Sequence, residues 1–339
     1  MRKAVILFNL GGPDKLESVQ PFLFNLFNDP AIISIPSIFR YPLAKFISAK
    51  RAPIAKNIYR EIGDKSPILE LTQDQAKILE NNLSKKGDYK CFVVMRCWHP
   101  RAMDIIKKVK EYNPSEIVLL PLYPQYSAST SGSSIKEWND LCKKENYKVK
   151  TKTICCYPTE SNFLESHASL IKKIIKNLDK NFKLLFSAHG LPENKIKKGD
   201  PYQWQVEQTV EGIMTKLKDE NLDYTISYQS RVGPLKWIGP STDEVIIKYS
   251  KENRGIVIVP VAFVSEHSET LVELDIEYKK LAEKNGCSFY KRVPALGIEE
   301  NFIKGLTELV LQQETKGNFV STIMCPDKYK KCPCLALKS

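Results

Sequence analysis

Short apolar runs typical of β-strands alternate with helical stretches along almost the whole of this 339-residue chain. The strand-like runs cover residues 5–10, 91–95, 116–121, 149–155, 183–186, 224–228, 255–261 and 289–293. The helical patterns include residues 18–27, 101–111, 163–178, 201–217, 241–251 and 299–311. Parallel strands need such crossovers, so the alternation predicts an α/β protein with doubly wound parallel sheets. The number of runs suits two four-stranded sheets, with a break near residues 145–165.

Two of the four histidines stand where a strand-like run gives way to a helical pattern. His189 lies in the segment Ser187-Ala188-His189-Gly190-Leu191-Pro192, and His267 lies near the start of an acidic segment at 266–278. The carboxyl ends of strands are where open α/β sheets bind their ligands. We therefore expect both histidines to belong to a functional site.

The acidic segment carries Glu269, Glu273 and Glu277 at intervals of four residues. On an α-helix this spacing places the three carboxylates along one face. Charged ladders are common on solvated helices, and that interpretation stays open. The nearby His267 and the strand end favour a functional interpretation, because an imidazole beside a carboxylate can hold a divalent cation or pass protons.

Composition and charge limit the class of protein. Hydrophobic residues make up 42% of the chain and charged residues 27%, which supports packed cores and excludes a disordered protein. The net charge of +12 favours acidic partners, and the lack of a nucleic-acid motif favours lipid or a polycarboxylate substrate among them. No apolar run is long enough to span a bilayer, and no signal peptide precedes the first strand, so a cytoplasmic protein is expected.

Nine cysteines are many for a cytoplasmic protein, in which disulfides are rare. Three of them crowd the tail as Cys325, Cys332 and Cys334. Such a group indicates a metal or an iron–sulfur centre. Three thiolates are one short of four, and the adjacent Cys155 and Cys156 are candidates for the fourth. A flexible tail without any metal is the alternative.

Residues 30–51 are apolar, aromatic and studded with cations. An amphipathic helix packed on the core would explain this composition. The alternative is an exposed lip that touches a membrane or an apolar ligand. The turn Gly11-Gly12-Pro13 after the first strand is expected to be structural, since no Walker lysine or dinucleotide fingerprint accompanies it.

Taken in order, the chain resembles the ferrochelatase family from about residue 5 to residue 311. The segments that carry the resemblance include Asn9-Leu10-Gly11-Gly12-Pro13, Ala49-Lys50-Arg51-Ala52-Pro53, Arg96-Cys97-Trp98-His99-Pro100, Leu122-Tyr123-Pro124-Gln125-Tyr126-Ser127, the His189 segment, Gly199-Asp200-Pro201-Tyr202, Tyr228-Gln229-Ser230-Arg231, Trp237-Ile238-Gly239-Pro240 and the acidic segment.

The resemblance implies a chelatase-like fold of two similar Rossmann-like domains, 1–155 and 156–311, followed by a cysteine-containing tail at 312–339. The last helix is expected to cross to the first domain. The implied enzyme is a lyase-class metal chelatase of haem biosynthesis that inserts Fe²⁺ into protoporphyrin IX. Coproporphyrin III is the alternative substrate, and a non-catalytic porphyrin or haem carrier is the alternative of another class.

The resemblance also assigns roles to residues. It makes His189 and Glu269 the catalytic pair and the ligands of the incoming iron. It places on the path of protons or iron Glu273, Glu277 and His267. It assigns porphyrin contacts to Arg96, Tyr123, Ser127, Trp237, Ile35 and Arg51, the last two in the lip. A free-base porphyrin loses two pyrrole protons as the metal enters, and an unperturbed histidine is a base of suitable pKa.

The spacing of the tail cysteines resembles that of bacterial ferrochelatases that carry a [2Fe–2S] cluster. The implied ligands are Cys325, Cys332, Cys334 and Cys156 or Cys155, because Ser166 stands where the mammalian type has a cysteine. The expected setting is a monomer or homodimer in the cytoplasm, in peripheral contact with the anionic inner face of the cell membrane and without nucleic acid.

Overall fold

The structure is a computed structural model that describes residues 1–231, 233, 235–312 and 318–335; the parts of the predicted tail at 313–317 and 336–339 lie outside the described residues. The chain forms two compact units. The first unit combines Met1–Tyr123, Ser127–Cys155 and Leu306–Val320. The second combines Pro124–Tyr126, Cys156–Gly305 and the chain from Ser321 onward.

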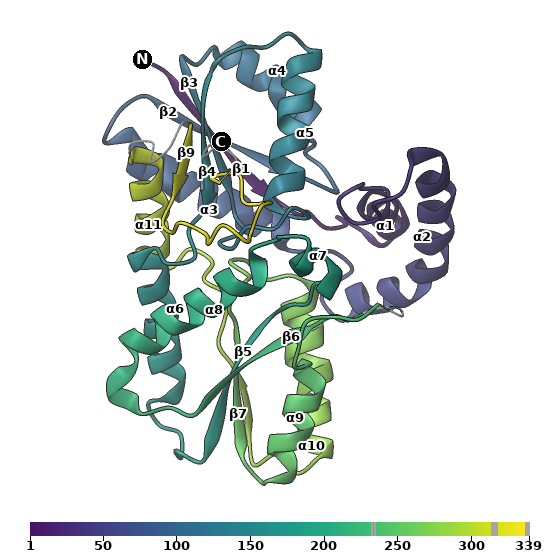
Figure 1. Cartoon of the computed structure of the whole chain (residues 1–339), viewed down its shortest axis with the longest axis vertical. Helices are drawn as coiled ribbons and strands as arrows, with labels where there is room; N and C mark the ends of the chain where they lie inside the picture. Colours follow the sequence, from purple (N-terminus) through teal and green to yellow (C-terminus); the bar gives the residue numbers. More distant parts are fainter. Residues whose placement is uncertain (232, 234, 313–317, 336–339) are drawn as a thin grey trace. The chain divides into compact units, whose positions relative to one another are not determined.

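The first unit contains a sheet in the strand order β2-β1-β3-β4-β9 (Figure 1). Its strands are β1 (Lys3–Asn9), β2 (Tyr89–Met95), β3 (Glu116–Pro121), β4 (Lys150–Cys156) and β9 (Phe319–Ser321). β1 pairs in parallel with β2 and β3, and β3 pairs in parallel with β4. The parallel α/β architecture is confirmed. The fifth strand, β9, is a difference from the expected four, because its three residues are too few to show a strand pattern in the sequence.

Some helices of this unit pack on the sheet, and others stand apart from it. They are the 3₁₀ helix η1 (Leu16–Ser18), α1 (Val19–Phe27), α2 (Ser37–Arg60), α3 (Ile68–Ser84), α4 (Ala102–Tyr112) and α5 (Ser131–Lys144). One core cluster joins Phe8 of β1 to Ile106 of α4 and Trp138 of α5. The rings of Phe8 and Trp138 meet edge to face, with their centroids 5.9 Å apart. Burying such aromatic and aliphatic groups is what holds these helices on the sheet.

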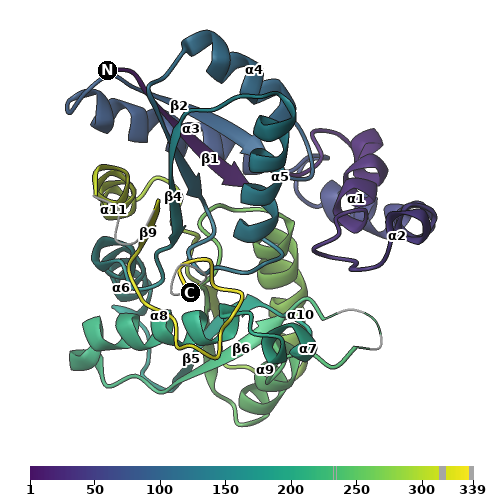
Figure 2. The same ribbon diagram turned by 45° about the horizontal axis from the view of Figure 1, so that its top comes forward.

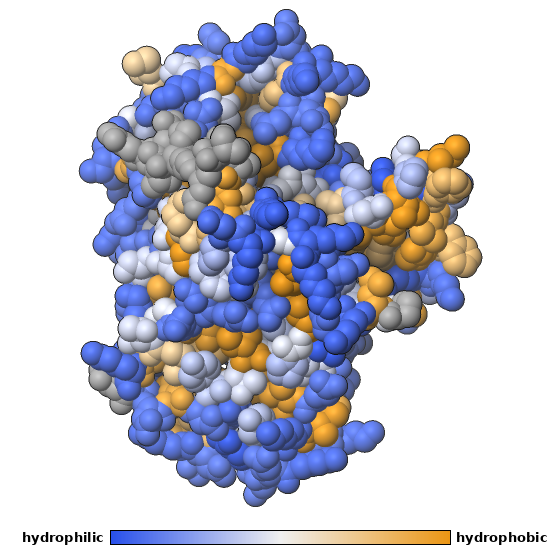
Figure 3. Space-filling view, in the orientation of Figure 1, coloured by the Kyte–Doolittle hydropathy of each residue, from blue (hydrophilic) through white to orange (hydrophobic). Residues whose placement is uncertain are grey.

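Helices α1 and α2 lie side by side and stand apart from the sheet of their unit in both ribbon views (Figures 1 and 2). The large apolar residues that α2 exposes include Ile38 (75%), Phe39 (64%), Tyr41 (56%) and Phe46 (66%). We call these four residues the α2 apolar surface; it appears as the orange patch over α2 at the right of Figure 3. The predicted lip is therefore helical and exposed over this stretch, and these side chains are not part of a core.

The second unit contains a parallel sheet in the order β6-β5-β7-β8. Its strands are β5 (Phe182–His189), β6 (Tyr224–Gln229), β7 (Gly255–Pro260) and β8 (Tyr290–Arg292). Its helices are α6 (Ser161–Ile175), α7 (Glu193–Lys197), α8 (Tyr202–Lys216), the 3₁₀ helix η2 (Lys218–Glu220), α9 (Thr242–Lys251), the π-helix η3 (Glu269–Glu277) and α10 (Tyr278–Lys284). Helix α11 (Glu300–Leu311) runs from this unit into the first.

The four core strands wind in the same order in both units, since β2-β1-β3-β4 and β6-β5-β7-β8 follow one pattern. In each sheet the order reverses between the first strand and the third, which are β1 and β3 or β5 and β7. Doubly wound sheets bind ligands at the carboxyl ends of the strands beside such a reversal. Among the described helices, none has the length and apolar character of a membrane-spanning segment.

Candidate active site and cysteine group

The candidate active site lies at the carboxyl ends of β5 and β7, where the strand order of the second sheet reverses. Strand β5 ends on His189. From the end of β7 at Pro260, the chain continues through His267 into η3, whose first residue is Glu269. The two segments singled out in the sequence therefore meet at the edge of the sheet where ligands bind.

His189 and Glu269 form a close polar pair. The distance from Nδ1 of His189 to Oε2 of Glu269 is 3.1 Å, and the side chains are 39% and 29% exposed. Burial lowers the pKa of His189, but the charge and hydrogen bond of Glu269 outweigh it and raise this pKa above 6.5. Burial likewise raises the pKa of Glu269, but His189 outweighs it and the pKa falls to about 2. The pair therefore favours an imidazolium beside a carboxylate, which differs from the unperturbed imidazole expected from the sequence.

The acidic segment is helical, as predicted, but its winding is that of a π-helix. The backbone N–H of Tyr278 donates to the carbonyl of Glu273, five residues earlier. π-Helices are rare and usually one turn long, and they occur often at functional sites. Glu269 and Glu273 still project from the same side, because both meet groups at the ends of β5 and β6.

Four donors surround the carboxylate of Glu273. They are Nε2 of Gln229 at 2.9 Å, the backbone N–H of Ser230 at 3.0 Å, the hydroxyl of Ser230 at 2.6 Å and the hydroxyl of Tyr278 at 3.0 Å. Ser230 has a φ of 62°, a left-handed conformation uncommon for serine, and its N–H points at this carboxylate. Burial and the charge of Glu269 nevertheless raise the pKa of Glu273. This carboxylate is thus fixed in place and ready to take up a proton.

A cavity of about 170 Å³ adjoins Glu273 within the second unit. Its lining includes Glu273, Glu277, Asp243, Ser230 and Tyr278. Glu277 is exposed to solvent. The carboxylates of η3 thus lead from His189 to a polar, open cavity.

His267 and Trp237 complete the predicted residues of this unit. Burial lowers the pKa of His267, its ring meets Phe263 edge to face, and its Nδ1 has no hydrogen-bond partner among the described residues. The imidazole is therefore neutral. Trp237 packs against the backbone that follows His189: a Cβ built on Gly190 would lie 3.2 Å from its ring and 3.0 Å from the carbonyl oxygen of Gln229. A side chain at position 190 would therefore crowd this ring.

The other predicted porphyrin contacts lie in the first unit. The charge of Arg96 is already balanced by two carboxylates. Its guanidinium contacts Asp29 at 2.9 Å and Glu137 at 3.1 Å, and it donates to Ser133 at 2.8 Å.

Two more of these predicted contacts, Tyr123 and Ser127, carry hydroxyl groups and follow β3. Burial raises the pKa of Tyr123, and the Oγ atoms of Ser127 and Ser129 are 2.8 Å apart. The lip residues differ from them: Ile35 and Arg51 are both exposed, and Arg51 lies over the ring of Phe27.

Several residues at the site had no role assigned from the sequence. They are Tyr202, Gln229, Ser230, Asp275 and Arg292. The hydroxyl of Tyr202 bonds to the backbone of His189, and burial raises its pKa. A usable signal existed for Gln229 and Arg292, because each ends a strand, as His189 does. For Tyr202 and Asp275 the sequence offers no comparable signal.

The cysteines of the tail are buried in the second unit. The sulfur atoms of Cys332 and Cys334 lie within 4.8 Å of each other. A hydrogen bond with Cys332, together with burial, raises the pKa of the Cys325 thiol. Cys156 lies beside this group, because Nε2 of Gln205 contacts its sulfur at 3.4 Å and that of Cys325 at 3.2 Å. Buried thiols at these distances could hold a metal.

The fold is that of metal chelatases. A structure of SirB from Bacillus subtilis with Fe³⁺ superposes with a TM-score of 0.52 at 14% identity, covering 92% of this chain and 95% of that one. A second, of the sirohydrochlorin chelatase SirB from Bacillus subtilis subspecies spizizenii in complex with cobalt, gives 0.50 at 10% identity and covers 90% and 92%. At these identities the likeness shows the architecture alone.

Sequence similarity gives the family. The model of the ferrochelatase family matches residues 2–314. The ferrochelatase of Pelagibacter ubique is 64% identical over 342 aligned residues, which cover 99% of each chain. The chain belongs to the ferrochelatase family. The predicted recognition, the metal-chelatase class and the insertion of iron into a porphyrin in haem biosynthesis are confirmed.

Proposed function

We propose that this chain inserts Fe²⁺ into protoporphyrin IX, with His189 and Glu269 as the residues that carry out the reaction. The observation that carries the proposal is the close polar pair at the reversal of strand order, with Nδ1 of His189 3.1 Å from Oε2 of Glu269. Nδ1 is engaged by the carboxylate, so Nε2 is the ring nitrogen that can meet the substrate. Trp237 beside Gly190 supplies a flat apolar surface suited to the macrocycle.

The protonation state of His189 limits what it can do. A protonated imidazole can neither bind Fe²⁺ nor accept a proton, so His189 acts in its neutral form. A metal and a proton compete for the same nitrogen, so Nε2 accepts a pyrrole proton only while it is not bound to Fe²⁺. The porphyrin releases two protons for each Fe²⁺ that it takes up.

The carboxylates of η3 provide a route for those protons. The raised pKa of Glu273 makes this carboxylate a proton acceptor next to Glu269, and the cavity beyond it reaches exposed Glu277. We propose that protons leave along this row, and that the neutral imidazole of His267 serves as a transient ligand on the path of iron.

The choice of protoporphyrin over coproporphyrin rests on the α2 apolar surface. Protoporphyrin carries two carboxylates and two vinyl groups, so it is the more lipophilic of the two. Exposed apolar side chains at Ile38 and Phe46 suit such a ring. Arg51 is free of any carboxylate partner among the described ion pairs and is suited to a propionate. Arg96 is neutralised by Asp29 and Glu137, so we propose that it orders the wall of the binding site.

The proposal is tested by substituting the pair. His189→Ala should abolish metallation under anaerobic conditions while porphyrin binding, followed by fluorescence, stays close to that of the wild type. Glu269→Gln keeps the shape of the side chain but removes its charge, and should lower turnover by about three orders of magnitude. Turnover of protoporphyrin and coproporphyrin measured side by side decides the substrate. An active His189→Ala enzyme would end the assignment.

We propose further that the tail cysteines hold a [2Fe–2S] cluster, with Cys325, Cys332, Cys334 and Cys156 or Cys155 as ligands. Four thiolates are required, and Cys156 is a candidate for the fourth because Gln205 contacts both its sulfur and that of Cys325. The cluster would supply an electron-accepting centre and a cross-link for the tail. We assign it no step of the metallation reaction.

We also propose peripheral contact with an anionic membrane surface. The α2 apolar surface supports it, together with the exposed cations Lys45, Lys50 and Arg51 of the same helix.

A further inference from the structure

We propose that Arg292 is a positioning residue for metal insertion: it holds the rear of the π-helix η3 so that Glu269 and Glu273 keep their places beside His189. This inference rests on the roles proposed for His189 and Glu269. Arg292 contacts neither of these two residues in any described polar contact, so it acts through the helix that carries the carboxylate.

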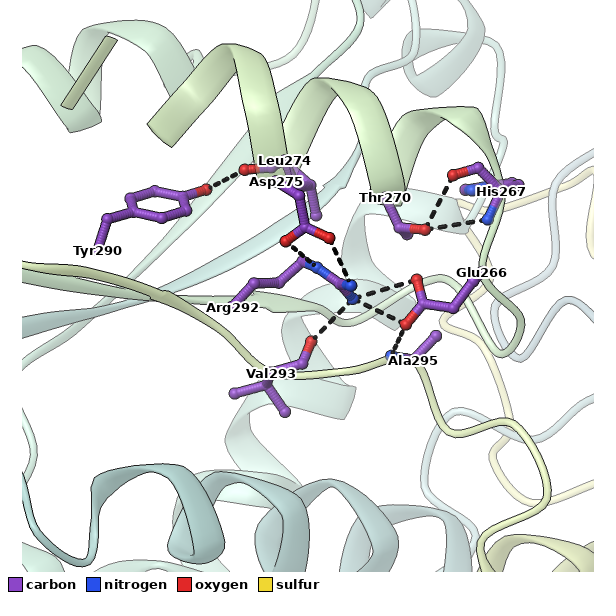
Figure 4. A network of polar contacts seen from close by, with 9 residues as sticks. All are labelled: Glu266, His267, Thr270, Leu274, Asp275, Tyr290, Arg292, Val293 and Ala295. Carbon is purple, nitrogen blue, oxygen red and sulfur yellow. Dashed lines mark hydrogen bonds and ion pairs between the residues drawn. The ribbon is translucent and has the colours of Figure 1, made fainter. Parts of the chain in front are cut away.

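The guanidinium of Arg292 binds two carboxylates, those of Asp275 and Glu266 (Figure 4). Its Nε and Nη2 donate to the two carboxylate oxygens of Asp275 at 2.6 and 2.7 Å, a bidentate contact. Its Nη1 donates to Glu266 at 2.8 and 3.1 Å. Glu266 also accepts the backbone N–H of Ala295 at 2.9 Å. Bidentate contacts of this kind fix orientation as well as distance.

The two carboxylates that bind Arg292 belong to residues close in sequence to the residues of the proposed site. Glu266 immediately precedes His267, and Asp275 lies on η3 two residues after Glu273. At the start of the helix, the hydroxyl of Thr270 donates to the carbonyl of His267 and accepts the backbone N–H of His267, both at 3.0 Å. The Arg292 clamp therefore ties the entry of η3 to its second half.

Strand β8 contributes a second hold on the same side. The hydroxyl of Tyr290 donates to the carbonyl of Leu274 at 2.7 Å. Tyr290 and Arg292 are two apart on the strand, so they share one face. Glu269 and Glu273 meet groups at the ends of β5 and β6, while Leu274 and Asp275 are bonded to β8. Contacts on opposite sides fix the rotation of η3 about its axis.

The guanidinium at the centre of the clamp is shielded from water, and its two carboxylate partners are partly exposed. The side chain of Arg292 is 11% exposed, and those of Glu266 and Asp275 are 22% and 36% exposed. Removing one member of such a cluster leaves the remaining charges without their partner, so the helix shifts or unwinds to hydrate them. The same segment could also wind as an α-helix, in which each backbone hydrogen bond spans four residues in place of five. Reversion to that alternative would rotate Glu273 relative to Glu269.

The test compares Arg292→Met with Arg254→Met. Arg254 is a matched control in the same unit: it is 20% exposed, pairs with Asp223 at 2.8 Å and donates to the carbonyl of Phe182 at 2.7 Å, near the starts of the strands. Both variants should lower the unfolding temperature. Only Arg292→Met should lower kcat, by about 100-fold, because a misplacement of about 1 Å at a reacting group has an effect of that size. KM for porphyrin and for Fe²⁺ should stay within about threefold.

Two further variants keep the test decisive. Asp275→Asn weakens the clamp more gently and should lower kcat about tenfold, so it serves if Arg292→Met does not fold. Arg292→Lys should restore part of the loss, because lysine keeps the charge without the planar fork. Wild-type kcat in Arg292→Met or in Asp275→Asn, or an equal loss in Arg254→Met, overturns the inference. Glu269→Gln is measured alongside: if it is active, both the proposed function and this inference fail, whereas if it is inactive, a failure of Arg292 concerns the clamp alone.

Discussion

At the scale of the residue, the charges of His189 and Glu269 depend on pH in opposite ways. The folded pKa of Glu269 lies below the ordinary 4.5, so its contribution to stability is present above pH 4.5 and is lost as the pH falls towards about 2. The folded pKa of His189 lies above the ordinary 6.5, so its contribution is present below pH 6.5 and is lost as the pH rises through the folded value. The pair therefore stabilises the fold fully between these two ordinary values.

This coupling predicts the titration of His189 directly. In the wild type, the imidazole should titrate above pH 6.5 in an NMR experiment, with its signal assigned from a His189→Asn sample. Glu269→Gln should lower this pKa, because burial remains while the opposing charge is gone. Glu277→Gln is the matched control: Glu277 lies eight residues further along the chain and is exposed, so the His189 titration should not move. An unchanged pKa in Glu269→Gln would contradict the pairing.

At the scale of the element, the sequence predicts those features that depend on a local pattern of residues. The apolar run at Gly255–Pro260 predicts a strand, and the capping box of Ser241 and Glu244 predicts the start of a helix. Neither prediction depends on the rest of the chain. The π winding of η3 has no such signal. Glutamates four apart suit an α-helix, and the winding is held by Arg292 and Tyr290, which arrive on a later strand.

The chemistry of the site shows the same division. His189 is recognisable because it ends a strand, and Glu269 because it begins the helical segment after a later buried strand-like run. The neutralisation of Arg96 is not, because Asp29 and Glu137 reach it from distant parts of the sequence. Contacts between elements decide charge and winding, and they are not encoded in any short segment.

The tail yields a prediction at this scale. Protein purified without oxygen should be brown, with about two irons per chain, if its thiolates hold a [2Fe–2S] cluster. Cys332→Ser should bleach it, because it removes a ligand, and of Cys156→Ser and Cys155→Ser the one that removes the fourth ligand should do the same. Cys91→Ser is the matched control, since Cys91 lies on β2 and outside the tail group. Colourless anaerobic protein without acid-labile sulfide would show that these cysteines are not cluster ligands.

At the scale of the whole molecule, a net charge of +12 acts together with the α2 apolar surface. Binding to vesicles that contain anionic lipid should be measurable by co-sedimentation at low salt. It should weaken as salt rises, because each nearby Lys or Arg contributes about 1 kcal/mol that ions screen. Replacing Ile38 and Phe46 together with serine should weaken binding at every salt concentration.

A matched control for that experiment is Ile298→Ser. Ile298 is an apolar side chain of the second unit and is 53% exposed. Its removal should leave vesicle binding unchanged. If the control and the double substitution weaken binding equally, or if the wild type stays in the supernatant at low salt, α2 is not the membrane contact.

The route of the chain through its two units sets an order of completion during synthesis. All four strands of the second sheet lie within Cys156–Gly305, whereas the first unit also requires Leu306–Val320, which bring the end of α11 and the start of β9. A ribosome releases the amino-terminal half first. The sheet that emerges first is therefore completed last, and the edge of β4, where Thr153 later donates to the carbonyl of Asn318, stays unpaired while the second sheet forms. Nascent chains stalled after residue 305 should expose that edge to chaperones.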